Sequence, residues 1–146
     1  TSSGKLVPQR NQRVEEVGRA TGAAQVVLTA HSMGGLVCRS YLARHGGGRV
    51  DRLITIASPH AGTELARIGI GKNAREMVPG SLWLKDLATE NVPVPTISIR
   101  TPHDNYVMPQ DNQRLPGAID IEMDGIGHLS VLYARRTADE LIAACR

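Results

Sequence analysis

One serine lies at the junction of a strand-like and a helix-like sequence pattern, which makes it a candidate for a chemical role. Residues 26–36 read VVLTAHSMGGL, so an apolar and β-branched run reaches Ser32 and two glycines follow. This pattern predicts a buried strand, a turn and a helix. Ala30 and Gly34 are small enough for a sharp turn that lifts the hydroxyl clear of a sheet. We therefore predict that Ser32 is a nucleophile; the alternative is a serine that only caps the helix.

A serine hydroxyl is a weak nucleophile, so it needs a histidine base and an acid that orients the base. The turn is similar to the nucleophile turn of the α/β-hydrolases, and this resemblance implies that the acid and then the base follow in the loops after two later strands. Here TPHDN follows the apolar run 96–100 and offers Asp104, and GIGHLS follows the run 118–124 and offers His128. The predicted triad is therefore Ser32, Asp104 and His128.

Other histidines and acids compete for these roles, and their positions in the chain argue against them. His45 lies at a predicted helix end, where a partly cationic ring suits the helix dipole. His60 follows a strand end and is expected at the mouth of the site, and His103 is expected on the surface beside the acid. His31 is expected to point away from Ser32 and to support the site. The competing acids belong to the later strand or lie well past the loop: Asp111, Asp120 and Asp124.

The elements that must position these residues alternate along the chain. Helical spacing is predicted over 9–20, 33–45, 81–89 and 130–144, and strands over 24–30, 50–58, 96–100 and 118–124. Several strands are nearly continuous in apolar residues, which is typical of a parallel sheet with helices on both faces. We expect one α/β domain over 1–146, with a flexible leader over 1–8 and a loop or lid over 59–89.

Composition excludes several classes of function. The chain has 146 residues, a formal net charge of +3, and 41% hydrophobic and 21% charged residues, which is typical of one globular domain. Aromatic residues make up 3% and the basic residues are scattered, so nucleic-acid binding is not expected. No metal-ligand spacing is evident, so neither a metal ion nor a cofactor is expected. The sequence assigns no cellular compartment.

Four segments resemble the α/β-hydrolase superfamily, in particular the bacterial true lipases and esterases. They are AHSMGG at 30–35, SPHAGTELA at 58–66, TPHDNYV at 101–107 and DGIGHLSVL at 124–132. The resemblance implies Ser32 as nucleophile, Asp104 as acid and His128 as base, with the Met33 N–H as one oxyanion-hole donor. It implies hydrolysis of ester or lipid substrates through an acyl-serine intermediate. Acyl transfer to an alcohol or amine would use the same residues.

The resemblance also places the segment 61–87 over the active site. Its apolar side chains would form an acyl pocket or short lid, with core packing as the alternative: Leu65, Ile68, Ile70, Met77, Val78, Leu82 and Trp83. Substrate contacts are expected from these residues: His31, Leu65, Ile68, Trp83 and Leu129.

Only the C-terminal part of the hydrolase fold is matched. The strand and H-G-type loop that supply a second oxyanion donor have no counterpart in this sequence. The nucleophile strand is therefore expected at an edge of the sheet, and an exposed apolar edge invites pairing with another chain. We expect either a fragment of a longer enzyme or a homo-oligomer formed through this strand. The alternative function is a non-catalytic module that acts through oligomerisation or partner binding.

Overall fold

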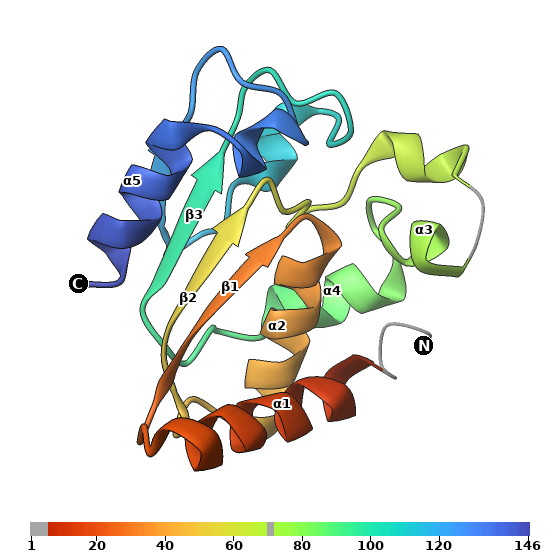
Figure 1. Cartoon of the computed structure of the whole chain (residues 1–146). Coiled ribbons are helices and arrows are strands. Elements are labelled where there is room, and N and C mark those ends of the chain that lie inside the picture. Colours follow the sequence, from red (N-terminus) through yellow and green to blue (C-terminus); the bar gives the residue numbers. More distant parts are fainter. Residues whose placement is uncertain (1–5, 70–71) are drawn as a thin grey trace.

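The chain alternates between strands and helices, as the sequence patterns predict (Figure 1). The computed structural model describes residues 6–69 and 72–146. Its strands are β1 (Val26–His31), β2 (Val50–Ile56), β3 (Thr96–Arg100) and β4 (Ile119–Glu122). Its α-helices are α1 (Leu6–Thr21), α2 (Met33–His45), α3 (Lys72–Glu76), α4 (Leu82–Thr89) and α5 (Arg135–Ala144). Short 3-10 helices are η2 (Glu64–Arg67), η3 (Gln110–Gln113) and η4 (Ser130–Leu132).

The four strands form one sheet in the order β1-β2-β3-β4, and each neighbouring pair is parallel. Near their carboxyl ends, His31 pairs with Ile56, and Ile56 pairs with Ile99 on the next strand. The strands therefore end on the same side of the sheet, where the loops that follow them meet. β1 lies at an edge of the sheet. This arrangement confirms the predicted α/β fold with the Ser32 strand at an edge.

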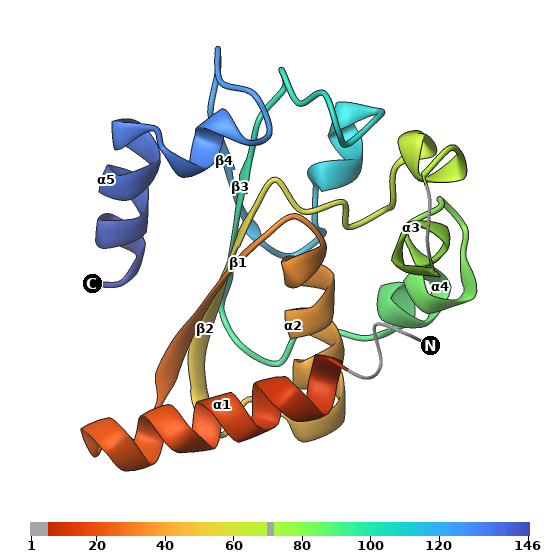
Figure 2. The same cartoon turned by 45° about the vertical axis from the view of Figure 1, so that its right-hand side comes forward.

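Helices cover both faces of the sheet, with α2 on one face and α5 on the other (Figure 2). Successive residues of a strand point to opposite faces, so alternate side chains meet different helices. On the α2 side, Ala30 and Leu53 share a buried core with Leu42. On the α5 side, Ile54 shares a second core with Ala144. The nearly continuous apolar character of β2 follows from this burial on both faces.

Helix α1 begins earlier than its sequence pattern indicates. Val7 is buried in the same core as Val14 and Tyr41, so packing stabilises a first turn that propensity alone does not reveal. Residues 6–8, which were expected in the leader, are therefore helical. The rest of that leader, residues 1–5, lies outside the described residues.

The helix expected over 130–144 is divided into η4 and α5. Ala134 has φ −72° and ψ 130°, an extended conformation that no helix can pass through. The Val131 N–H donates to the Gly127 carbonyl at 3.0 Å, so η4 belongs to the turn around His128 rather than to α5. Val131 still reaches the α5-side core, as its place in the apolar pattern predicts.

Two other predicted elements have the bounds that the sequence gives them. α2 spans residues 33–45 and β3 spans residues 96–100. The predicted cap of α4 is also present, because Ser81 Oγ accepts a hydrogen bond from the Leu84 N–H at 3.3 Å. Within the part of the chain that the structure describes, no helix combines the length and apolar character that crossing a bilayer requires.

Candidate active site

Ser32 lies in the turn between β1 and α2 and has the left-handed backbone that a nucleophile turn requires. Its φ is 53° and its ψ is −128°, a region that residues with side chains rarely adopt. Its N–H donates to the Ile56 carbonyl at 2.9 Å, and its own carbonyl accepts from the Gly35 N–H at 3.1 Å. These bonds tie the strained turn to β2 and to α2, at the carboxyl end of the sheet.

Beside this turn, the backbone of Gly35 packs closely against the Ser58 side chain. A Cβ added to Gly35 would lie 2.2 Å from the Ser58 Oγ, whereas one added to Gly34 would lie 3.5 Å from the Ala30 Cβ. Sequence reasoning identified Ala30 and Gly34 as the positions that need small side chains. The structure shows that Gly34 has room for a methyl group and that Gly35 has none.

Three side chains from separate loops form a continuous chain of hydrogen bonds. The Ser32 hydroxyl lies 3.1 Å from His128 Nε2, and His128 Nδ1 lies 2.6 Å from Asp104 Oδ2. A carboxylate can only accept, so Nδ1 carries the ring proton and Nε2 is free to accept from the serine hydroxyl. His128 is 4% exposed and Asp104 is 1% exposed, so water competes little for either bond.

The Asp104 carboxylate is fixed by backbone groups of its own loop. Its Oδ1 accepts from the Tyr106 N–H at 2.7 Å and from the Val107 N–H at 2.6 Å. Oδ2 is therefore left for His128. An aspartate that binds backbone N–H groups two and three residues on is a common turn device, so the order Asp-Asn-Tyr-Val was a signal available in the sequence.

His31 contacts the back of the His128 loop. Its Nε2 donates to the His128 carbonyl at 2.9 Å, and the two rings lie 4.6 Å apart at an interplanar angle of 49°. Burial lowers the pKa of His31, and the hydrogen bond to the carbonyl only partly offsets this effect. This position fits the expectation that His31 supports the site better than the expectation that it contacts substrate.

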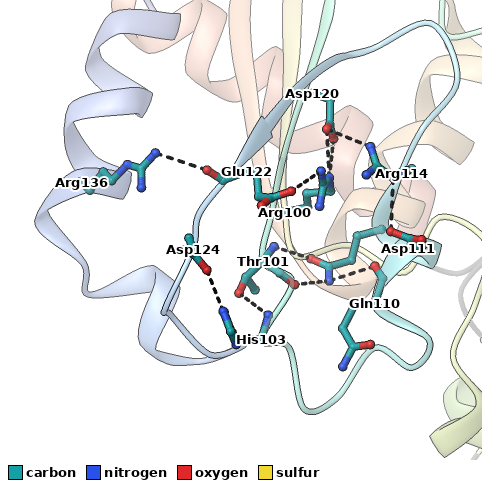
Figure 3. Close-up of polar contacts among 11 residues, drawn as sticks. Arg100, Thr101, His103, Gln110, Asp111, Arg114, Asp120, Glu122, Asp124 and Arg136 are labelled. Carbon is teal, nitrogen blue, oxygen red and sulfur yellow. Dashed lines mark hydrogen bonds and ion pairs between the residues drawn. The ribbon is translucent and has the colours of Figure 1, made fainter.

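The competing acids are each engaged with a partner other than His128 (Figure 3). Asp124 Oδ1 lies 2.7 Å from His103 Nε2, so a competing acid and a competing histidine pair with each other. Asp120 accepts from Arg100 Nε at 2.9 Å. The remaining acid, Asp111, pairs with Arg114 at 3.3 Å. Arg100 also donates to Glu122, so an ion-pair network covers the β3–β4 edge.

Gln113 holds the loop that carries Asp104, and sequence reasoning did not identify it. It is fully buried, its side-chain oxygen accepts from the Thr101 N–H at 3.0 Å, and its amide donates to the Thr101 carbonyl at 2.8 Å. Thr101 Oγ1 in turn donates to the Ile126 carbonyl in the His128 loop. The two loops are thus joined to each other by contacts that no local sequence motif predicts.

His60 is in a different environment from the one expected. It was placed at the mouth of the site, but it is 6% exposed, with Nε2 3.0 Å from Thr55 Oγ1 and Nδ1 3.4 Å from Arg39 Nη1. Burial, together with the charge of Arg39, lowers the pKa of His60 to about 3. His60 is therefore neutral at neutral pH, in a separate cluster from the triad.

The residues expected to contact substrate lie in two kinds of environment. Leu65, Ile68 and Leu129 are exposed apolar side chains. Trp83 is 8% exposed and packs in a core with Leu36, and its Nε1 donates to Ser40 Oγ at 2.8 Å. Core packing, the alternative raised from the sequence, therefore describes Trp83. Ile70, which was expected in the acyl pocket, lies outside the described residues.

The N-terminus of α2 offers backbone donors beside Ser32. Met33 and Gly34 are the first two residues of this helix. Their N–H groups have no acceptor within the helix, and the helix dipole favours negative charge at this end. The Met33 N–H, which the resemblance implies as an oxyanion donor, belongs to the first residue of this helix.

Known proteins share this fold. Residues 15–125 match the sequence family described as the PGAP1-like alpha/beta domain. The mature lipase BlEst2 of Bacillus licheniformis superposes with a TM-score of 0.79 and 19% identity, over 91% of this chain and 70% of the lipase. The monoacylglycerol lipase of Paleococcus ferrophilus superposes with a TM-score of 0.64 and 14% identity, over 99% of this chain and 74% of that one.

A carboxylesterase structure from the thaumarchaeon Nitrososphaera gargenis is also similar, with a TM-score of 0.65 and 13% identity. That match covers 98% of this chain and 71% of the esterase. At such identities the likeness establishes the fold, which is that of the α/β-hydrolase superfamily.

Proposed function

This chain belongs to the PGAP1-like alpha/beta domain family, and from that premise we propose that it is a serine hydrolase of carboxylic esters. The observation that carries the proposal is the chain of hydrogen bonds from Ser32 through His128 to Asp104. A serine is activated in this way when a histidine accepts its proton and a carboxylate orients that histidine.

The reaction follows from the positions of these atoms. Ser32 Oγ attacks the ester carbonyl carbon while its proton passes to His128 Nε2. His128 then gives this proton to the leaving alcohol as the carbon–oxygen bond breaks, which leaves an acyl-serine. A water molecule then loses a proton to Nε2 and attacks the acyl carbon. The bond between this carbon and Ser32 Oγ breaks, the proton on Nε2 passes to Oγ, and the carboxylic acid leaves. Asp104 stays ionised and stabilises the imidazolium that forms in each half-reaction.

The first turn of α2 would stabilise the charge that develops on the substrate oxygen. The Met33 N–H is the proposed donor to this oxyanion, because it lies directly after Ser32 at the positive end of the helix dipole. Removal of one such donor costs about 2.7–4 kcal/mol in other enzymes, so the number of donors strongly affects the rate.

The proposed substrates are esters with an apolar acyl or alcohol portion. The structures that resemble this chain include a lipase, a monoacylglycerol lipase and a carboxylesterase. Leu65, Ile68 and Leu129 present exposed apolar surface for such a group. No metal ion or cofactor takes part in the proposed reaction.

A fluorophosphonate probe tests the nucleophile directly. We expect the wild-type protein to become labelled at Ser32 and the Ser32→Ala variant to stay unlabelled. Ser130→Ala, which removes an exposed serine close to His128 in sequence, is the matched control and should label normally. A folded wild-type protein that does not react would refute the proposal. A series of p-nitrophenyl esters would then rank acyl lengths.

The edge position of β1 favours a second candidate function, a module that binds another chain. Val26, Val27 and Leu28 are half-buried in this strand, and in the part of the chain that the structure describes no strand pairs with its outer edge. Such an edge can pair with a strand of a second copy or a partner. Gel filtration with light scattering tests the first possibility, since a stable monomer would contradict self-association.

A further inference from the structure

Arg39 is a buried cation that has no acidic partner among the described residues. It is 6% exposed, and its guanidinium donates to the Leu87 carbonyl at 2.9 Å and faces His60 Nδ1 at 3.4 Å. Both acceptors are neutral, and among the described residues Arg39 takes part in no ion pair. Burial of a charge costs free energy unless the charge is paired, and no negatively charged group in the described part of the chain balances this guanidinium.

The charge persists under physiological conditions. Burial lowers the pKa of Arg39 to about 10, which still leaves the guanidinium protonated at neutral pH. His60 cannot neutralise it, because the histidine accepts with Nδ1 and therefore carries its proton on Nε2, which donates to Thr55 Oγ1. The pair is a fixed cation beside a neutral acceptor.

Arg39 and His60 lie in the wall of a cavity of about 610 Å³. This volume is in the range of sites that hold small organic molecules. The cavity lies between α4, the 90–96 stretch and the 114–118 loop. It contains none of the three triad residues. The connection between β3 and β4 has only η3 as a helix, so no α-helix of that crossover covers this part of the sheet.

The lining of the cavity combines apolar side chains with several polar and charged ones. The apolar walls are formed by side chains from three segments: Leu84, Ala88, Val92, Val94, Leu115 and Ala118. Lys85 and Arg114 add positive charge, and among the described residues Glu90 is the one carboxylate in the lining. Arg114 is already paired with Asp111 and Asp120, whereas Lys85 has no ion pair among the described residues.

We propose that this cavity binds a small organic carboxylate, with the carboxylate on Arg39 and an apolar tail along the walls from α4 and the 114–118 loop. The ligand would supply the missing negative charge and form charge-assisted hydrogen bonds with the guanidinium. Its tail would bury the apolar lining. The site is separate from Ser32 and does not depend on the proposed esterase activity.

Isothermal titration with octanoate tests the proposal, with octan-1-ol as a neutral probe of equal chain length. We expect octanoate to bind with a dissociation constant of about 1 mM or tighter, which is ordinary for a ligand of this size. Arg39→Met should weaken octanoate binding by about tenfold to a hundredfold and leave octan-1-ol binding nearly unchanged. Arg44→Met, which removes an exposed arginine from the same helix, is the matched control and should bind octanoate as the wild type does.

A second variant keeps the test decisive if Arg39→Met does not fold. Ala88→Phe places a large side chain at an exposed position of the cavity lining and leaves Arg39 intact. It should also abolish octanoate binding. The proposal is overturned if octanoate does not bind at 10 mM, a concentration about tenfold above the expected constant. It is also overturned if octanoate binds equally well to Arg39→Met or to Ala88→Phe.

Discussion

Two buried histidines of this protein have opposite electrostatic partners. His128 has its Nδ1 against the Asp104 carboxylate, whereas His60 has its Nδ1 against the Arg39 guanidinium. The two rings are almost equally buried, at 4% and 6% exposure. The carboxylate makes Nδ1 of His128 a donor and frees Nε2 for Ser32, and the guanidinium makes Nδ1 of His60 an acceptor.

The comparison shows that burial alone does not make a histidine a base. A base must become a cation during its reaction, so it needs a negative neighbour. His60 has a positive neighbour, and burial beside that charge lowers its pKa to about 3. His60 therefore has a structural role, as a hydrogen-bond acceptor for the buried Arg39 guanidinium.

The largest effect is expected from the carboxylate partner of His128. Asp104→Asn should reduce kcat by about 10³–10⁴, because an amide beside Nδ1 no longer selects the tautomer that accepts from Ser32. Steady-state hydrolysis of a p-nitrophenyl ester measures this loss. Asp124→Asn, which alters the acid paired with His103, should keep most of the activity. Equal losses in the two variants would show that Asp104 has no special role.

A smaller effect is expected in α2, the helix that connects the two histidine sites because it begins after Ser32 and contains Arg39. Gly35→Ala should lower the free energy of unfolding by about 1–3 kcal/mol, because the new methyl would overlap Ser58. Urea denaturation measures this change. Gly34→Ala is the matched control, with room for a methyl group beside Ala30. If both variants were equally stable, the close approach at Gly35 would not be important.

Exchange of His60 should affect stability rather than catalysis. His60→Leu removes one partner from Arg39 and one from Thr55, so we expect a loss of about 1–3 kcal/mol in the free energy of unfolding with kcat nearly unchanged. His128→Leu should also lower stability, because it leaves Asp104 Oδ2 without a partner, but unlike His60→Leu it should abolish activity. A large loss of kcat in a folded His60→Leu protein would contradict the division of roles.

The pH dependence of stability provides a further test of His60. Its folded-state pKa is about 3, below the ordinary value of 6.5, so the unfolded chain binds a proton first as the pH falls. Its contribution to stability is complete above pH 6.5 and is lost between pH 6.5 and about 3. Unfolding curves at several pH values should show a shallower decline for His60→Leu than for the wild type. Parallel declines would indicate that His60 titrates normally.

The smallest effect concerns the charge of Arg39 itself. Arg39→Met should raise the pKa of His60, because the cation no longer opposes the imidazolium, although burial still holds the pKa below its ordinary value. A titration followed by NMR of the ring carbons measures this shift. An unchanged pKa would show that burial alone sets the protonation of His60.

The sequence predicts local structure well where one pattern acts alone. The apolar run before Ser32, the helical spacing after it and the Ser81 cap each depend on neighbours within a few residues. The bounds of α1 were less predictable, because Val7 is held by packing against α2 rather than by its own turn. The environment of Trp83 was also not predictable from the sequence, since an apolar side chain suits a protein core and a ligand pocket equally.

The amino-acid sequence by itself determined the parallel α/β order, the turn at Ser32, and the succession of Ser32, Asp104 and His128 along the chain. Only the tertiary structure decided which acid meets which histidine, and that a guanidinium meets His60. The physical reason is that the two residues of each pair are 21 to 24 positions apart in the chain. Their contact depends on strand register and on bonds such as those of Gln113, which no local pattern encodes.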